Sequence, residues 1–352
     1  MVSLFMPIPS KSCSNECQNS YMPPQTAAIA NEQFIVGKWD AGVFEEMVYN
    51  VCRGISSDID ASKFPVVVFE PHVDTSRLLY STMARFISAN GVAVVVIDHP
   101  GDASIVQFSS SRTRDLQTVY NSGTVPLSNL SPITTWNYTV QRAVDTRISD
   151  IRFTLSQIST AALHQRQFTT LRFTSGLNTA SYGIIGHGLG GTVASSPGLP
   201  TPTSSAVKFS INLSGTPPLL SSDVRNPPLF FFGRTDFRRG HDIHWPTTWS
   251  RITGPATEFD LDDSAIFDMT DLPIVVGLAK TEGGKKNIKA RGLSGNAPAE
   301  NARAVTCFLG NIVKEHFGLD GQGRNVGNCI RMFSVVAPYP GYARKEQDNK
   351  II

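Results

Sequence analysis

A glycine-rich turn is the place where this sequence most clearly invites chemistry. Residues 181–187 (SYGIIGH) have the apolar pattern of a buried strand, and they run into 186–191 (GHGLGG). A strand, a sharp turn and a helix in this order form the nucleophile elbow G-x-S-x-G, which exposes a serine. The middle residue here is Gly188, which has no side chain to attack a carbonyl. A dinucleotide loop is the weaker alternative, because the spacing is not G-x-G-x-x-G and no acidic ribose partner is evident.

Two histidines and an aspartate are the candidates for acid–base chemistry near that turn. His72 and Asp74 follow the apolar run 64–71, and His187 lies in the glycine-rich turn itself. Histidine exchanges protons near neutral pH, and a neighbouring carboxylate can orient it. We therefore expect His72, Asp74 and His187 to be the catalytic residues. The alternative is that Asp74 or Thr75 caps the next helix, that His72 lies on the surface and that His187 only packs.

A second group of polar residues has the look of a metal site. His241, Asp242 and His244 lie close together in the chain. A zinc site needs further ligands, and the sequence offers no distant partner for them. We expect no metal and no cofactor.

The elements that must position these residues alternate between strands and helices. Apolar, β-branched runs predict strands, and apolar residues at helical spacing predict helices. The expected strands are 64–71, 92–98, 181–187, 207–213, 228–232 and 258–261, and the expected helices are 75–89, 140–159 and 301–317. This alternation predicts an α/β fold with a mostly parallel sheet flanked by helices.

The chain divides into a short lead-in and one domain. Residues 1–32 are rich in Ser, Pro and Asn and look irregular, and residues 33–352 hold the single expected domain. The Ser/Thr-rich stretch 101–138 shows little periodicity, so we expect an insertion or lid that covers one end of the sheet.

Composition excludes several classes of protein. The 352 residues include 31 basic and 29 acidic side chains, a net charge of +2, which gives no electrostatic case for nucleic acid. We expect no membrane span, because no apolar run is long enough. The five cysteines, an odd and scattered number, argue against a disulfide framework. Because the N-terminus lacks the pattern of a secretory signal, we expect a cytoplasmic protein, with secretion as the alternative.

Four segments give the chain a family resemblance. They are 69–81 (FEPHVDTSRLLYS), 95–103 (VVIDHPGDA), the turn 186–191, and 228–233 (PLFFFG) followed by 245–249 (WPTTW). In these segments the chain resembles the α/β-hydrolase family of platelet-activating-factor acetylhydrolases and related fungal esterases. The resemblance implies an α/β-hydrolase fold and a Ser-Asp-His triad in that chain order.

That triad is missing at each position to which the resemblance carries it. Gly188 stands at the nucleophile, and Ser214 stands where the acid is expected, in the turn 212–215 (NLSG). Ser264 or Ile266 stands at the histidine position, and no histidine lies between His244 and His316. Because triad members act as a unit, we expect a pseudohydrolase without ordinary serine-esterase activity.

A hydrolase pocket without its nucleophile still offers shape, apolar walls and backbone donors. These can accelerate a cyclisation or isomerisation, such as a Diels–Alder-type pericyclisation, of a small hydrophobic polyketide, terpenoid or alkaloid. The resemblance to fungal proteins that accompany biosynthetic enzymes points to secondary metabolism. The expected pocket residues are Val73, Gly188, Leu189, Ser214, Trp245 and Phe267. Two alternatives stay open: a non-catalytic binding or scaffold protein, and a residual hydrolase with another nucleophile such as Ser214. The sequence does not predict the oligomeric state.

Overall fold

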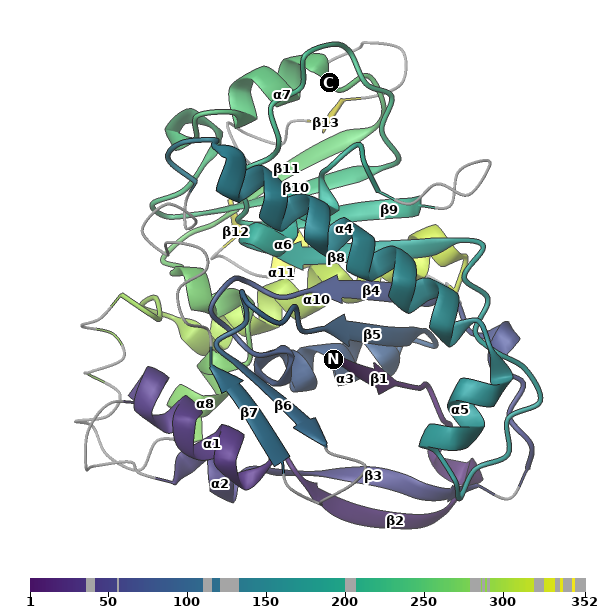
Figure 1. Ribbon diagram of the computed structural model, residues 1–352. Helices are drawn as coiled ribbons and strands as arrows, with labels where there is room; N and C mark the ends of the chain where they lie inside the picture. The colour runs from purple at the N-terminus through teal and green to yellow at the C-terminus, as the bar shows by residue number, and fades with distance from the viewer. Residues whose placement is uncertain are drawn as a thin grey trace.

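The computed structural model describes residues 1–35, 42–55, 57–109, 116–120, 133–199, 207–278, 286, 289, 292–319, 326–332, 336–337 and 344–345. Within these ranges nine strands form one sheet in the order β1-β5-β4-β8-β9-β10-β11-β12, with β13 beside β11 (Figure 1). Their bounds are β1 (Val2–Phe5), β4 (Val66–Glu70), β5 (Ala93–Ile97), β8 (Tyr182–His187), β9 (Val207–Leu213), β10 (Leu229–Arg234), β11 (Ala256–Leu261), β12 (Val336–Ala337) and β13 (Arg344–Lys345). The six central strands, β5, β4, β8, β9, β10 and β11, pair in parallel. Strands β1, β12 and β13 pair antiparallel at the two sides of the sheet.

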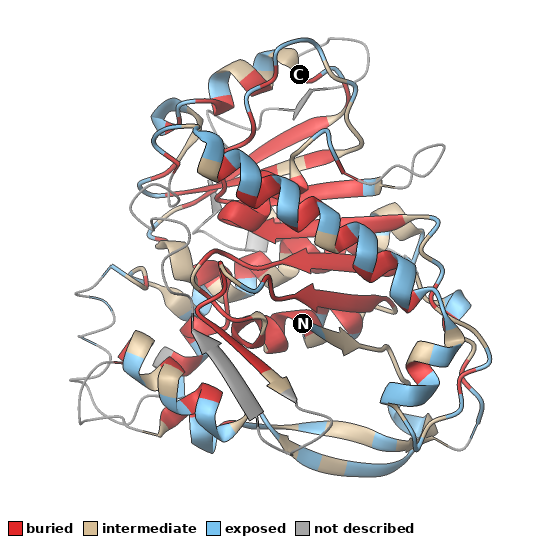
Figure 2. Cartoon of the chain, in the orientation of Figure 1, coloured by how far each residue is buried: buried red, intermediate tan, exposed pale blue. Residues whose placement is uncertain are grey.

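The central strands are buried on both faces, which explains their mainly apolar sequence. Every residue of β4, β5 and β8 is buried, and Figure 2 shows these strands as one buried layer. Side chains alternate along a strand, so Val67 and Phe69 enter one core while Val66 and Val68 enter the other. The strands expected from the sequence are confirmed, as is the α/β-hydrolase fold in a single domain.

Helices cover both faces of the sheet. On the face of Val66 lie α4 (Tyr138–Ile158), α5 (Ala161–Gln167) and α6 (Leu189–Ala194). On the face of Phe69 lie α1 (Pro24–Ala30), α2 (Val43–Glu46), α3 (Ser81–Ser88), α8 (Leu272–Leu278), α10 (Pro298–Phe317) and α11 (Val326–Met332). In Figure 1, α4 crosses in front of the sheet and α10 runs behind it. A third apolar cluster joins α7 (Trp245–Arg251) to β10.

The expectation of an irregular lead-in over 1–32 is wrong. This segment holds β1, which pairs with β5, and α1. It also holds β2 (Cys13–Ser20), which forms a separate antiparallel ribbon with β3 (Val48–Ile55). The β2 sequence is polar and mostly exposed, so it carries no apolar pattern by which a strand is recognised. Its order comes from a partner strand distant in the sequence.

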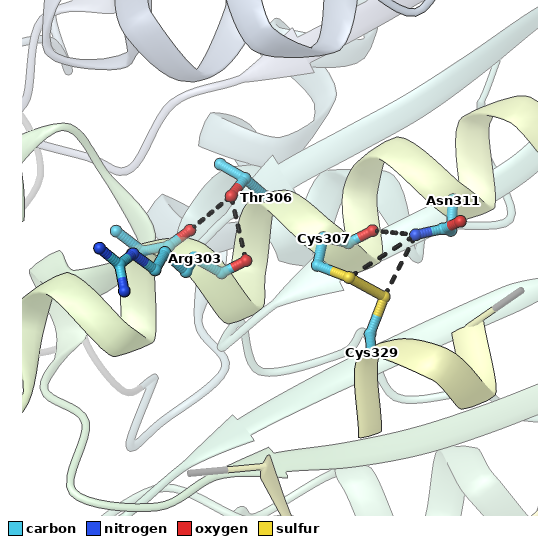
Figure 3. Close-up of a disulfide and its surroundings, with 6 residues drawn as sticks. Arg303, Thr306, Cys307, Asn311 and Cys329 are labelled. Carbon is cyan, nitrogen blue, oxygen red and sulfur yellow. Dashed lines mark hydrogen bonds between the residues drawn. A yellow bond between two sulfur atoms is a disulfide. The ribbon is translucent and has the colours of Figure 1, made fainter. Parts of the chain in front are cut away.

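Four of the five cysteines form disulfides, so the expectation that the chain lacks a disulfide framework is wrong. Cys13–Cys52 joins β2 to β3, and Cys307–Cys329 joins α10 to α11. Figure 3 shows the second pair, where the amide of Asn311 lies 2.8 Å from the carbonyl oxygen of Cys307. Cys17 is free. An odd count of cysteines excludes only complete pairing, and it is compatible with two disulfides and one free thiol.

The stretch 101–138 is only partly described. It contains the hairpin of β6 (Ile105–Ser109) and β7 (Leu116–Tyr120), which lies apart from the main sheet. Thr26 of α1 donates a hydrogen bond to the Gln107 side chain of β6 at 2.7 Å. Residues 110–115 and 121–132 lie outside the described residues, so the lid function remains a prediction.

Candidate functional site

The turn between β8 and α6 has the geometry of a nucleophile elbow. Gly188 occupies it with φ 54° and ψ −118°, a conformation that favours glycine. Its N–H donates to the carbonyl oxygen of Leu213 at the end of β9 (2.9 Å). A Cβ at Gly190 would overlap the carbonyl oxygen of Glu70 on β4, so this glycine permits the close approach of α6. The short α6 ends at Ala194, three residues before Pro197, which cannot continue a helix interior.

His72 fills the space above Gly188. The loop after β4 carries this side chain, and only 4% of the residue is exposed. A Cβ built on Gly188 would lie 2.6 Å from Nε2 of His72 and closer still to Cδ2. The imidazole therefore lies where the side chain of a nucleophile would begin.

The hydrogen bonds of His72 define its protonation. Nδ1 lies 2.5 Å from the carbonyl oxygen of Val73, and because a carbonyl only accepts, Nδ1 must carry the proton. Nε2 is buried and has no hydrogen-bond partner among the described residues. Burial lowers the pKa of His72 to about 4. The ring is therefore neutral at pH 7, with the lone pair of Nε2 directed into the site.

Tyr80 connects His72 to His187, and the sequence reasoning missed it. Tyr80 ends the 3₁₀ turn Arg77–Tyr80 and is fully buried. Its hydroxyl accepts the backbone N–H of His72 (3.0 Å) and lies 2.9 Å from Nδ1 of His187, to which it can donate. Burial, above all, and the positive charge of Arg234 hold the pKa of His187 well below its usual value. Both histidines are thus neutral and face each other, with ring centroids 5.1 Å apart.

Asp74 does not orient His72. Its backbone is left-handed (φ 54°), and its carboxylate lies 3.4 Å from the side-chain nitrogen of Gln33. None of the hydrogen bonds among the described residues joins it to His72. The cap of the following turn is Ser76, whose hydroxyl accepts the N–H of Leu78 at 3.3 Å. The predicted His72–Asp74 pair is therefore wrong, and so is the alternative in which His72 lies on the surface.

The turn at the end of β9 carries the second predicted triad position. Ser214 has a left-handed backbone (φ 59°), and a Cβ on Gly215 would overlap the carbonyl oxygen of Gly188, so this turn touches the elbow. Arg234, at the end of β10, donates to the Ser214 hydroxyl and forms an ion pair with Asp236 at 2.7 Å. Sequence reasoning missed Arg234, although a charge ending the apolar run LFFFGR was a usable signal.

The structure gathers most, but not all, of the remaining predicted pocket residues. Val73 and Leu189 adjoin His72 and Gly188 in the chain and are buried, and the ring of Phe267 lies 6.0 Å from that of His72. Ser264, the position expected for the triad histidine, donates to the carbonyl oxygen of Leu261 within its own turn (2.6 Å). Trp245 packs in the third cluster, with its ring 5.1 Å from Phe231 and 5.9 Å from Phe237.

A buried ionic network supports the loop that carries His72. Arg147 of α4 bonds the carboxylate of Asp102 at 2.7 and 2.9 Å and the carbonyl oxygen of Pro71 at 2.7 Å. His99 lies between Glu70 and Asp150, with each ring nitrogen 2.7 Å from a carboxylate oxygen. Burial alone would lower the pKa of His99, but these two carboxylates raise it to about 9.

The described residues contain no group of three or more His, Cys, Asp and Glu placed to hold a metal ion. Among His241, Asp242 and His244, the aspartate has a structural role. Its carboxylate accepts the backbone N–H groups of His244 and Trp245 at 2.8 and 2.7 Å. Within the described ranges no helix is both long and apolar enough to cross a membrane.

Comparison with known proteins agrees with this architecture. A ferulic acid esterase from Streptomyces cinnamoneus superposes with a TM-score of 0.63 at 18% identity, over 90% of this chain and 82% of that one. A protein of Arthroderma benhamiae named a probable 1-alkyl-2-acetylglycerophosphocholine esterase is 29% identical over 264 residues. That match includes 72% of this chain and 61% of the relative's length. The family model of platelet-activating factor acetylhydrolase isoform II matches residues 28–313, most of the sequence, and the chain therefore belongs to that family.

Proposed function

We propose that this chain is a non-hydrolytic member of its family, which has lost the Ser-Asp-His triad and uses the hydrolase scaffold for binding. The observation that carries the proposal is the imidazole of His72 lying over Gly188, where a serine would stand in an esterase. Gly188 cannot attack an ester, and the space that a serine side chain would occupy is filled by the ring of His72. The relative from Arthroderma benhamiae is named an esterase, so this chain would differ from it in activity while sharing its scaffold.

Ser214 is the hydroxyl that a residual hydrolase would need. It is 3% exposed, and its oxygen accepts a hydrogen bond from the guanidinium of Arg234. A serine nucleophile needs a base that removes its proton, and a guanidinium cannot do so. The geometry thus argues against Ser214 as a substitute nucleophile.

The proposal is tested with p-nitrophenyl acetate and a 2-acetyl glycerophosphocholine as substrates. We expect no hydrolysis above that of the heat-denatured protein, and no labelling by a fluorophosphonate probe. Ser214→Ala is the matched control, and it should leave the background rate unchanged. Turnover that requires the folded chain and disappears in Ser214→Ala or His72→Ala would overturn the proposal.

Cyclisation or isomerisation of a hydrophobic substrate, as expected of a fungal biosynthetic enzyme, is the second candidate. The observation in its favour is the unpartnered Nε2 of His72, since a neutral imidazole can accept a proton from a substrate. Against it stands the burial of His72 and His187, because a substrate could reach Nε2 only after the loop moved.

Mass spectrometry of an extract incubated with the protein separates these functions. A product of unchanged mass but altered retention, formed by the native chain and not by His72→Gln, would favour the isomerase. A compound that gains one water would indicate hydrolysis. A compound retained unchanged on the protein supports binding.

We also propose that the protein matures in an oxidising compartment rather than in the cytoplasm. Two disulfides in one chain support this, because such bonds rarely persist in reducing cytosol. Intact-mass measurement under non-reducing, alkylating conditions should find a single reactive thiol, that of Cys17. Five alkylated cysteines in the natively produced protein would contradict the proposal.

A further inference from the structure

A cavity of about 540 Å³ lies at the opposite edge of the sheet from the elbow. Parallel strands all end at the elbow side, whereas this cavity is bounded by the beginnings of β9 and β10 and by Pro255, just before β11. The segment after α6 forms another wall, because α6 starts at the elbow and runs back across the sheet. The volume of the cavity lies within the range of roughly 300–1,000 Å³ that is typical of small-molecule sites.

The walls of this cavity are mainly apolar. Leu199, Leu220, Leu229 and Ile252 are buried and contribute aliphatic side chains, and the buried Ser210 adds a hydroxyl. No acidic residue is among the lining residues. The cavity therefore suits an aliphatic body better than a sugar or a nucleotide.

Two cations lie at the outer edge of the cavity. Leu229 of β10 pairs with Ser210 of β9. Lys208 precedes Ser210 by two residues, and Arg225 precedes Leu229 by four. Both cations therefore lie beyond this pair, toward the beginnings of the strands. Both side chains line the cavity and both residues are exposed. Among the described residues neither forms an ion pair, in contrast to Arg234 and Arg238, which pair with Asp236 and Asp262.

We infer that this cavity binds a medium-chain aliphatic carboxylate. The hydrocarbon tail lies against the leucines and Ile252, and the carboxylate lies between Lys208 and Arg225. Burial of the tail supplies the affinity, and the two unpaired cations select an acid over a neutral amphiphile. The inference goes beyond the proposed function, because the cavity is remote from Gly188 and exists whether or not the elbow hydrolyses esters.

Calorimetry of the full chain with sodium decanoate, below its micellar concentration, tests the inference. We expect one saturable site per chain, and decan-1-ol should bind at least about tenfold more weakly because it lacks the charge. Equal affinity for acid and alcohol, or no binding of decanoate at millimolar concentration, would overturn the inference.

Paired variants localise the site. Lys208→Ala with Arg225→Ala should weaken decanoate binding about tenfold or more and leave decan-1-ol unchanged. The matched control is Lys63→Ala with Arg172→Ala, which removes two exposed cations that do not line the cavity. Loss of affinity in the control, but not in the Lys208 and Arg225 variant, would refute the assignment.

The elbow variant His72→Ala distinguishes this inference from the proposed function. If decanoate binds in the cavity, its affinity is unchanged in His72→Ala. If the affinity changes there instead, the ligand occupies the elbow and the cavity assignment fails, while the absence of ester hydrolysis still stands. If the chain hydrolyses esters and still binds decanoate unchanged in His72→Ala, the proposed function fails and the cavity assignment stands.

Discussion

Two histidines at the same edge of the sheet occupy opposite electrostatic environments. His99, after β5, has a carboxylate oxygen 2.7 Å from each ring nitrogen. His72, after β4, has one carbonyl acceptor at Nδ1 and nothing at Nε2 among the described residues. Both are almost fully buried, so burial alone does not separate them.

The difference lies in how many acceptors each ring meets. An ionised carboxylate can only accept, so both nitrogens of His99 must donate and the ring is an imidazolium. His99 therefore belongs to a charged framework with Glu70, Asp102 and Arg147 that holds the loops in place. The uncharged ring of His72 fills space over Gly188. A charged network therefore supports the site, whereas the two histidines within it are neutral.

Breaking the charged framework should have the largest effect. Arg147→Met removes the cation that Asp102 bonds and frees the carbonyl oxygen of Pro71. We expect a loss of about 3–5 kcal/mol in the free energy of unfolding, because buried carboxylates lose their partner. Urea denaturation measures it. Arg172→Met, at a pair that is 82% exposed on the arginine side, is the control and should cost under about 1 kcal/mol. Equal losses in both variants would contradict a framework role.

The pH dependence of stability should separate the two histidines. The folded pKa of His99, about 9, lies above its unfolded value near 6.5, so its contribution is complete below pH 6.5 and is lost as pH rises through 9. The folded pKa of His72, about 4, lies below that value, so stability falls as pH drops from 6.5 to 4. Each change is roughly 3 kcal/mol, because a tenfold difference in proton affinity between the folded and unfolded states is worth about 1.4 kcal/mol.

Denaturation midpoints at several pH values check this contrast. His99→Gln should flatten the alkaline limb only, and His72→Gln the acid limb only. If His99→Gln instead altered the acid limb, the assigned protonation state of His99 would be wrong.

Adding a side chain at the elbow should cause the next largest loss of stability. Gly188→Ala places a Cβ against the ring of His72 and in a backbone conformation that alanine rarely adopts. We expect a loss of about 2–3 kcal/mol from overpacking and strain. Adding His72→Gly should recover part of this loss, whereas adding Phe267→Leu should not. Full stability of Gly188→Ala would mean that His72 does not occupy the space.

Periodicity predicted the fold well because its strands are buried and locally encoded. The runs at β4, β5 and β8 are mainly apolar and buried throughout, and α10 ends at Phe317, where the expected helix 301–317 also ends. The polar strand β2 escaped prediction, because its order depends on β3 and on the bond between Cys13 and Cys52.

The site was predicted in part for a similar reason. Chain position, together with the family resemblance, placed His72, His187 and Phe267 near Gly188. Two residues that chain position did not connect with the site affect their chemistry. The Tyr80 hydroxyl meets Nδ1 of His187, which lies 107 residues further along the chain, and the charge of Arg234 helps to lower the pKa of both histidines. Asp74 was assigned to His72 by adjacency, but its left-handed backbone leaves its carboxylate beside Gln33. Spacing predicts which residues meet at a sheet edge, and it does not predict the direction of each side chain in a loop.

Tyr80→Phe should give the smallest effect and the finest distinction. It removes only the hydroxyl that accepts the N–H of His72 and meets Nδ1 of His187. We expect a loss of about 1–2 kcal/mol, because a buried N–H is left without its acceptor. The packing of the ring against Phe69, 5.0 Å away, should remain. NMR titration of the histidine ring protons reports the local change: His187 should shift while His99 keeps its raised pKa. A shift of His99 in this variant would mean that the charged framework and the neutral pair form one coupled network rather than two separate environments.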